Sequence, residues 1–412
     1  MTGTVASIGD IALGATGATG ATERRLRLAR SSVAAIFFIN GAATANWLVR
    51  IPAVQAKLGL SKGALGVALL GVAVGALLAM PRAGHLAARF GSRPVTRVAA
   101  AIFGVTLLLP ALASNTVILV LALVALGVGH GALDVAMNAQ ASTVERAYGR
   151  PIMSSFHALW SAGGLVGSAT GGVVAQHGIG PATHLVPTAL VAGVLALLVT
   201  GGMLPASADV DTGEAAPARP RGILLTLGTM AFCVLLGEGA MADWSALYLR
   251  DVTGATPGAA AAGYAAFSLA MASGRFAGDA LTLRFGAMPL VRGGGLLAAL
   301  GLGLALVAGS SWAAIVGFGA VGAGFSVAFP LMLAKAGSLP GTTPGTAIAT
   351  VSVFGYTGFL AGPPLIGFVS QATNLRGGLL VVVLSSLTVA ALADGFRSSE
   401  HRGGAKPSSE LP

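Results

Sequence analysis

The chain has 412 residues, of which 55% are hydrophobic and only 9% are charged, whereas about 25% of the residues of an average soluble domain are charged. This composition excludes a soluble enzyme or binding module and predicts an integral membrane protein. The net charge of +10 does not indicate nucleic-acid binding, because the basic residues are scattered between apolar segments. The single cysteine, Cys233, excludes a disulfide framework within one chain.

Long segments without a single Asp, Glu, Lys or Arg indicate the membrane-spanning helices. Residues 98–133 and 151–208 are two such segments, and each has room for two spans, because one helix needs about 20 apolar residues to cross the bilayer core. In chain order we expect helices near residues 32–54, 62–81, 94–113, 115–139, 151–175, 184–204, 223–250, 257–276, 287–308, 312–334, 344–370 and 376–395. The expected fold is an all-α integral membrane protein with twelve transmembrane helices.

These spans divide the chain into two six-helix bundles. We expect bundles at 32–204 and 223–396, a linker at 205–222, and tails at 1–31 and 397–412. Residues of the first bundle recur in the second: Gly163, Gly167 and Gly172 as Gly358, Gly362 and Gly367, and Arg89-Phe90-Gly91 as Arg284-Phe285-Gly286. A duplicated apolar half is typical of a transporter that holds one central site between two bundles.

The positions of the basic residues predict the orientation. With both termini in the cytoplasm, most of the 24 Lys and Arg, Arg275 included, fall on the cytoplasmic side. The others are Arg50, Lys57, Lys62, Arg250 and Arg376. Cytoplasmic loops of membrane proteins are enriched in Lys and Arg, so we expect a multi-pass protein of the bacterial cytoplasmic membrane with both termini inside.

One polar helix face is the candidate for proton coupling. His130, Asp134 and Asn138 are spaced i, i+4, i+8 and therefore share one face of a helix. Ionisable groups inside a membrane are costly and usually functional, so we predict that Asp134 carries the coupling proton, together with His157 and His130. The alternatives for Asp134 are a structural hydrogen bond to His130 or Asn138, or an ion pair with Arg146 or Arg150.

A second acid, Glu238, lies near the middle of the seventh span, where a central substrate site would be. We predict that it binds substrate, with a structural hydrogen-bonded acid as the alternative. Amide side chains supply both donors and acceptors and suit hydroxyl-rich solutes. The expected substrate-binding set is Glu238, Asn40, Asn46, Asn138 and Trp160.

A gate is expected nearer the outer end of the spans. Trp47 and Trp244 occupy equivalent positions in the two halves, and Asp243 is placed to pair with Arg50 or Arg250. The predicted gate is therefore Trp47, Arg50, Asp243 and Trp244. The alternative for the two tryptophans is anchoring at the membrane–water interface.

The segment Gly84-His-Leu-Ala-Ala-Arg89-Phe-Gly91-Ser-Arg93, between the second and third spans, resembles the signature loop of the major facilitator superfamily. The resemblance extends over the whole chain and implies the major facilitator fold. The acid that this family usually carries before the Arg is Ala88 here, and its counterpart in the second half is Leu283. We expect Asp279, five residues before Arg284, to replace it in part.

A closer resemblance rests on Asp134-Val-Ala-Met-Asn138-Ala-Gln140, Ser155-Phe-His157-Ala158 and Glu238-Gly-Ala-Met-Ala-Asp243-Trp244. These segments are similar to the rhizopine-permease-like (MosC/YbjJ-type) branch of the superfamily, which is distantly similar to fucose–proton symporters. The resemblance implies secondary active transport.

The leading hypothesis is proton-coupled uptake of a small polar solute, sugar-like or cyclitol-like, by a monomer in contact with membrane lipid. Residues 167–172 partly resemble a signature of drug exporters, so proton-driven export of amphiphilic compounds is the alternative. A non-transport sensor or scaffold is a third hypothesis. No phosphate-binding loop, metal-ligand spacing or nucleophile motif occurs, so we expect no enzyme activity, no cofactor, no metal and no nucleic-acid partner.

Overall fold

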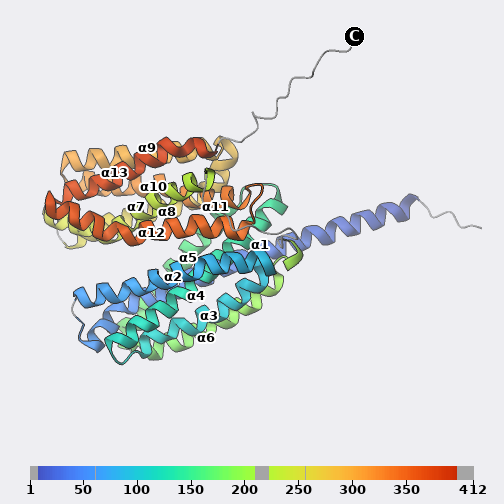
Figure 1. The fold of residues 1–412 in the computed structure, drawn as a ribbon, viewed down its shortest axis with the longest axis horizontal. Helices are drawn as coiled ribbons and strands as arrows, with labels where there is room; N and C mark the ends of the chain where they lie inside the picture. The colour runs from blue at the N-terminus through green and yellow to red at the C-terminus, as the bar shows by residue number, and fades with distance from the viewer. Residues whose placement is uncertain (1–7, 61, 209–221, 256, 397–412) are drawn as a thin grey trace, which may run out of the picture.

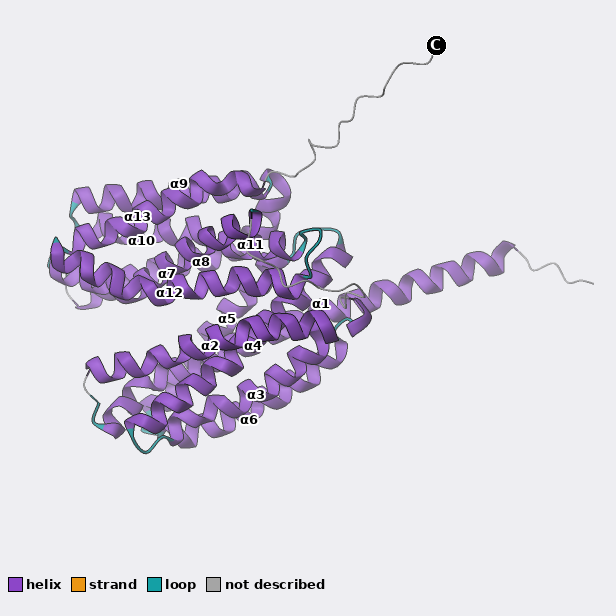
Figure 2. Cartoon of the chain, viewed as in Figure 1, coloured by secondary structure: helices purple, strands orange, loops and turns teal. Residues whose placement is uncertain are grey.

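The computed structural model describes residues 8–60, 62–208, 222–255 and 257–396. Within these ranges the chain is helical, with short loops and no strand (Figure 2). The helices of the first half are α1 (Ile8–Leu58), α2 (Lys62–Phe90), α3 (Ser92–Leu112), α4 (Thr116–Tyr148), α5 (Met153–Gln176) and α6 (Pro181–Val199). Those of the second half are α7 (Ile223–Thr253), α8 (Pro257–Phe285), α9 (Ala287–Ala308), α10 (Ser311–Phe325), α11 (Ala328–Gly337), α12 (Pro344–Ala372) and α13 (Leu375–Leu392). The short 3-10 helices are η1 (Thr200–Gly202), η2 (Ala206–Ala208) and η3 (Ala393–Phe396).

These helices provide the twelve expected spans. Eleven segments of the described chain are long and apolar enough to cross a membrane, and one of them, Ser311–Gly337, consists of α10 and α11 together. The twelfth span is α8, which has 29 residues and carries Arg275 and Asp279, so its polar side chains lower its hydropathy. The fold is that of an all-α, multi-pass membrane protein.

Two groups of helices lie side by side, α1–α6 in one and α7–α13 in the other (Figure 1). The helix α1 begins at Ile8, so the predicted N-terminal tail is helical over much of its length. This part of α1 extends beyond the rest of the first bundle (Figure 1). The predicted linker and the C-terminal tail lie largely outside the described residues.

The internal repeat corresponds to the same helix contact made twice. A Cβ on Gly163 of α5 would lie 2.1 Å from the carbonyl oxygen of Phe38 on α1. A Cβ on Gly358 of α12 would lie 2.1 Å from the carbonyl oxygen of Phe232 on α7. Only glycine permits this approach of two helix backbones, so the repeated glycines fix the equivalent pairs α1–α5 and α7–α12.

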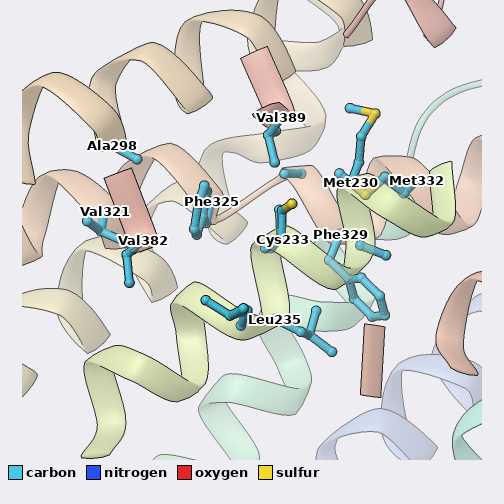
Figure 3. Close-up of a cluster of buried hydrophobic side chains, with 14 of the residues drawn as sticks. Met230, Cys233, Leu235, Ala298, Val321, Phe325, Phe329, Met332, Val382 and Val389 are labelled. Atoms are coloured by element: carbon cyan, nitrogen blue, oxygen red, sulfur yellow. The ribbon is translucent and has the colours of Figure 1, made fainter. Parts of the chain in front are cut away.

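Each bundle has its own apolar core. Figure 3 shows the core of the second bundle, where Met230, Cys233 and Leu235 of α7 pack near Phe325 and Phe329. Cys233 is 7% exposed, as expected for a cysteine that serves as a small apolar side chain.

The two bundles meet near one end. We call the end at which α2, α4 and α8 finish, and α3, α5 and α9 begin, the basic side, because Arg89, Arg146 and Arg284 lie there. On this side Gly84 of α2 packs so closely against Gly345 of α12 that a Cβ on Gly84 would lie 2.6 Å from the Gly345 carbonyl oxygen.

Two further close contacts join the bundles on the basic side. A Cβ on Gly337 of α11 would lie 2.2 Å from Ser142 Oγ of α4, and one on Gly278 of α8 would lie 2.7 Å from Ser154 Oγ of α5. Toward the opposite end the two groups of helices lie farther apart (Figure 1). The structure therefore shows a conformation in which the basic side is closed.

Candidate functional site

The polar face of α4 forms a hydrogen-bonded network in the interior of the protein. Asn138 Nδ2 donates to the Asp134 carbonyl oxygen at 2.9 Å and to Asp134 Oδ1 at 3.2 Å. His157 Nε2 of α5 lies 3.2 Å from Asn138 Oδ1. Asn138 therefore links the carboxylate to the imidazole, and three residues that the sequence singled out are adjacent.

The Asp134 carboxylate is only partly satisfied. Its residue is 8% exposed, and its Oδ2 has no hydrogen-bond partner among the described residues. The alternative ion pairs of Asp134 are not formed in the structure, where Arg146 donates to Thr143 and Arg150 lies over the Tyr148 ring. A buried carboxylate with an unpaired oxygen and no cation beside it is costly in its charged form.

His157 lies where the two bundles touch. Its ring is 5.2 Å from the Phe37 ring of α1 and 6.1 Å from the Phe329 ring of α11, both measured between centroids and both edge-on. Because Phe329 belongs to the second bundle, movement of one bundle against the other changes the environment of His157.

His130 makes a second link across the same interface. Its Nε2 lies 3.2 Å from the Tyr356 hydroxyl oxygen of α12, and its ring packs against Phe103 of α3. Thus His130 on α4 contacts the second bundle, whereas Asp134, one helical turn later, is hydrogen-bonded to Asn138.

A buried ion pair lies in the second bundle close to this network. Arg275 Nη2 of α8 is 3.5 Å from Glu238 Oε1 of α7, and Arg275 is 6% exposed. Arg275 Nη1 donates to Ser161 Oγ of α5 at 2.9 Å, and its Nε to the Ser326 carbonyl oxygen at 3.4 Å. The guanidinium therefore binds an acid of its own bundle and a hydroxyl of the other bundle at the same time.

Sequence reasoning placed Arg275 on the cytoplasmic side, at the end of a span near residue 276, and this prediction is wrong. The helix α8 continues to Phe285, so Arg275 lies within it. The signal was present in the repeat, since Arg284-Phe285-Gly286 mirrors Arg89-Phe90-Gly91. Each Gly of these triplets ends its helix with a positive φ, +86° at Gly91 and +80° at Gly286.

Among the other predicted substrate-binding residues, Trp160 and Asn40 form a pair, whereas Asn46 lies apart from them. Trp160 Nε1 donates to Asn40 Oδ1 at 2.8 Å, and Asn40 Nδ2 has no partner among the described residues. Asn46 is not brought to Glu238. Its Nδ2 donates to the Ala42 carbonyl oxygen at 2.8 Å, and it lines a separate pocket between α1, α5 and α6.

The four predicted gate residues are not assembled in this conformation. Trp47 is buried in the core of the first bundle, and Trp244 packs against the core of the second. Arg50 donates to the Ile179 carbonyl oxygen, while Arg250 pairs with Asp251 at 2.5 Å. Within the described ranges no hydrogen bond or ion pair joins Arg50 to Asp243.

The signature loop and its repeat lie on the basic side. Arg89 and Arg284 lie over the rings of Phe90 and Phe285, at 5.2 and 5.1 Å, and Arg93 Nη2 donates to the Gly201 carbonyl oxygen at 2.9 Å. The carboxylate of Asp279 does not bind Arg284.

Asp279 instead reaches the other bundle at the start of α5. Its Oδ1 accepts from Ser154 N at 3.0 Å and its Oδ2 from Ser155 N at 3.1 Å. Glu145, which sequence reasoning missed, accepts at the same helix end from Ile152 N and Met153 N, both at 2.8 Å. The N-terminus of α5 therefore binds one carboxylate from each bundle, as its free N–H groups and dipole favour.

Comparison with known proteins identifies the family. The Major Facilitator Superfamily model matches residues 33–343. The chain belongs to this superfamily. It is 38% identical over 357 residues to an MFS-type transporter of Yersinia pestis, covering 87% of this chain and 93% of that protein. It is also 35% identical over 382 residues to the membrane protein MosC of Rhizobium meliloti, covering 92% of each.

The fold comparison agrees with this membership. FucP, the fucose–proton symporter of E. coli, superimposes in its outward conformation with a TM-score of 0.75 at 17% identity, covering 90% of this chain and 98% of FucP. The recognition of the superfamily and of its MosC-like branch from sequence is confirmed. This superfamily member is a transporter of a small-molecule substrate and not an enzyme, and no group of three metal-binding side chains occurs in the part of the chain that the structure describes.

Proposed function

We propose that the protein is a proton-coupled symporter that takes up a small polar solute, sugar-like or cyclitol-like, across the bacterial cytoplasmic membrane. The observation that carries the proposal is the unpartnered Oδ2 of Asp134 in a network that ends at the bundle interface. The unpaired oxygen is a place for a proton, and the network connects it to a surface that changes when the bundles rock.

The basic side is the cytoplasmic side in this proposal, and both termini are cytoplasmic. The conformation described is then closed to the cytoplasm. Rocking of the bundles about a central site gives each side access in turn. The protein acts as a monomer, since one chain contains both bundles.

The substrate site in this proposal lies between Glu238 and Trp160. The Glu238 side chain keeps 22% of its surface exposed beside the buried Arg275, so the carboxylate is the accessible member of the pair. Trp160 supplies an aromatic face, and the buried Asn40 holds its indole N–H. Hydroxyl groups of a polyol suit this combination of a carboxylate acceptor and an aromatic ring.

The first experiment identifies the solute. Thermal stability of the purified protein is measured against sugars, inositols, amino sugars and amphiphilic cations, because a ligand at about 100 times its Kd stabilises the folded state by about 2.7 kcal/mol. A selective increase with a polyol supports uptake of a polar solute. Stabilisation only by amphiphiles supports the alternative, export of such compounds.

The coupling role of Asp134 has a separate test with the solute found in this way. In proteoliposomes with an imposed proton gradient, Asp134→Asn is expected to abolish accumulation against a concentration gradient, because an amide cannot gain and lose a proton. Exchange of labelled for unlabelled solute needs no net proton movement and is expected to continue.

The matched control is Asp251→Asn, which makes the same chemical change at an exposed carboxylate that pairs with Arg250. It is expected to accumulate solute normally. Full accumulation by Asp134→Asn would show that another group couples the proton.

A further inference from the structure

A pocket of about 570 Å³ lies inside the first bundle, between α1, α5 and α6. Most of its lining is apolar, but Asn46, His184 and three threonines also contribute to it. It shares no residue with the Asp134 network or the Arg275–Glu238 pair, so the symport proposal does not use it.

The polar side chains of the pocket converge beside Gly171 of α5. A Cβ on Gly171 would lie 3.0 Å from Asn46 Oδ1 and 3.5 Å from His184 Cε1, so glycine leaves these two groups room. His184 is 7% exposed, and its Nδ1 has no hydrogen-bond partner among the described residues. A buried ring nitrogen without a partner costs free energy, and a ligand atom that binds it removes this cost.

The same end of the pocket carries an uncompensated positive charge. Arg50 is 3% exposed, its Nη2 donates to the carbonyl oxygen of Ile179, which lines the pocket, and its charge acts on His184. Its Nε has no partner, and across the described ranges no carboxylate forms an ion pair with it. A buried guanidinium without a counter-ion favours an anionic group nearby.

The other end of the pocket opens toward the bilayer. Val191 and Leu195 of α6 line it and are 57% and 45% exposed. Their neighbours Leu190, Val194 and Leu198 are 60%, 56% and 68% exposed. In a membrane-spanning helix such a face contacts acyl chains, so whatever fills the pocket enters from the lipid.

We propose that this pocket binds an anionic phospholipid. The headgroup phosphate lies near Arg50 and His184, and one acyl chain follows Val191 and Leu195 along α6. The cationic end fits a phosphate by charge and by hydrogen bonding, and the apolar walls fit a hydrocarbon chain. Because α1 and α6 both line the pocket, a bound lipid holds the two helices together at the end opposite the basic side.

The test measures lipid binding to the full chain. Phosphatidylglycerol and phosphatidylcholine are added to delipidated protein in detergent, and bound lipid is counted by native mass spectrometry and by the increase in Tm. The unaltered protein is expected to bind phosphatidylglycerol about tenfold more tightly than phosphatidylcholine. Arg50→Gln is expected to bind phosphatidylglycerol about tenfold more weakly than the unaltered protein does, because a tenfold change in affinity corresponds to the loss of one charge-assisted hydrogen bond. Equal binding of the two lipids, or unchanged binding by Arg50→Gln, would overturn the proposal.

Two adjacent glycines provide a matched pair that does not alter the charge. Gly171→Val is expected to block the polar end and abolish the preference for phosphatidylglycerol. Gly172→Val is expected to retain it, because a Cβ at Gly172 meets no atom within 4 Å. If Arg50→Gln fails to fold, this pair still decides the question, and equal behaviour of the two variants would refute the site.

Inorganic phosphate distinguishes a lipid from a soluble anion. Phosphate alone is expected to leave the Tm unchanged and to compete poorly with phosphatidylglycerol, because it cannot occupy the apolar part of the pocket. Stabilisation by inorganic phosphate equal to that by the lipid would show that the site binds a soluble anion instead.

Discussion

At the scale of single residues, Arg275 contacts both bundles at once. Its guanidinium binds Glu238 in its own bundle and Ser161 in the other. Removing either member of a buried ion pair leaves an uncompensated charge, whereas removing both leaves none. Arg275 is therefore both a structural charge and a contact that the rocking motion must break or remake.

We predict that Arg275→Met lowers the Tm markedly and reduces the free energy of unfolding by about 3 kcal/mol or more. Glu238→Gln in the same chain is expected to restore part of this stability, because it removes the charge left behind. Thermal unfolding of the two single variants and the double variant in one detergent measures the coupling. Additive losses in the double variant would show that the two side chains do not act as a pair.

The sequence predicted individual polar residues better than their grouping. Asp134, Asn138 and His157 are brought together because helical spacing places the first two on one face and the start of the next helix places the third nearby. Asn40 and Asn46 are not brought together, because they are six residues apart and a helix turns by about 100° per residue, so the two side chains lie on different faces of α1. A depth estimate from sequence gives position along a helix but not direction around it.

At the scale of secondary-structure elements, the N-terminus of α5 is bound by two carboxylates with different consequences. Glu145 lies in the same bundle as α5, so its hydrogen bonds persist when the bundles move. Asp279 lies in the other bundle, so its hydrogen bonds to Ser154 and Ser155 exist only while the basic side is closed. An anion at a helix N-terminus stabilises the conformation that contains this contact by about 0.3–2 kcal/mol.

We predict that Asp279→Asn shifts the population toward a conformation open on the basic side. Opening is measured by maleimide labelling of Ser142→Cys, a position 2% exposed at the contact with Gly337. Labelling is expected to be several-fold faster in Asp279→Asn. Glu145→Gln is the control and should leave the rate unchanged, and an equal increase in both would indicate general loosening of α5.

The helix count was predictable and the course of two helices was not. Charge-free segments predicted twelve spans because membrane insertion demands apolar length. The exact position of the break between α10 and α11 at Ser326 was not predicted, although its signal, Pro330 in the first turn of α11, is in the sequence, because a proline cannot donate a hydrogen bond to the carbonyl of residue 326. The length of α8 was missed because its polar residues, which serve the bundle interface, resemble the end of a span.

At the scale of the whole molecule, closure of the basic side depends on how closely α2 and α12 approach. A Cβ on Gly345 would lie 2.6 Å from the Gly84 carbonyl oxygen and 3.1 Å from the Ala87 Cβ. The obstacle is backbone, which cannot move aside as a side-chain end can. The acid that the family usually carries before Arg89 is absent here. The contact of small residues between α2 and α12, which we call the α2–α12 seam, lies beside that position.

We predict that Gly345→Val prevents full closure of the basic side and abolishes net transport, because the cycle needs both conformations. Labelling of Ser142→Cys is expected to become fast and insensitive to substrate. Gly164→Val is the matched control, since a Cβ there meets no atom within 4 Å, and it should transport normally. Retained transport by Gly345→Val would show that the seam opens wider than the structure indicates.

The asymmetry of the closed side has a consequence for the ionic conditions in which the transporter works. The α2–α12 seam is held by the fit of small residues, and dissolved salt does not weaken a steric fit. The α5–α8 seam is held in addition by the Asp279 carboxylate, whose attraction to a helix end is screened as ionic strength rises. A rise in salt on the basic side would then loosen one seam before the other, so the basic side would open as a tilt about α2 and α12 and not as a parallel separation of the bundles.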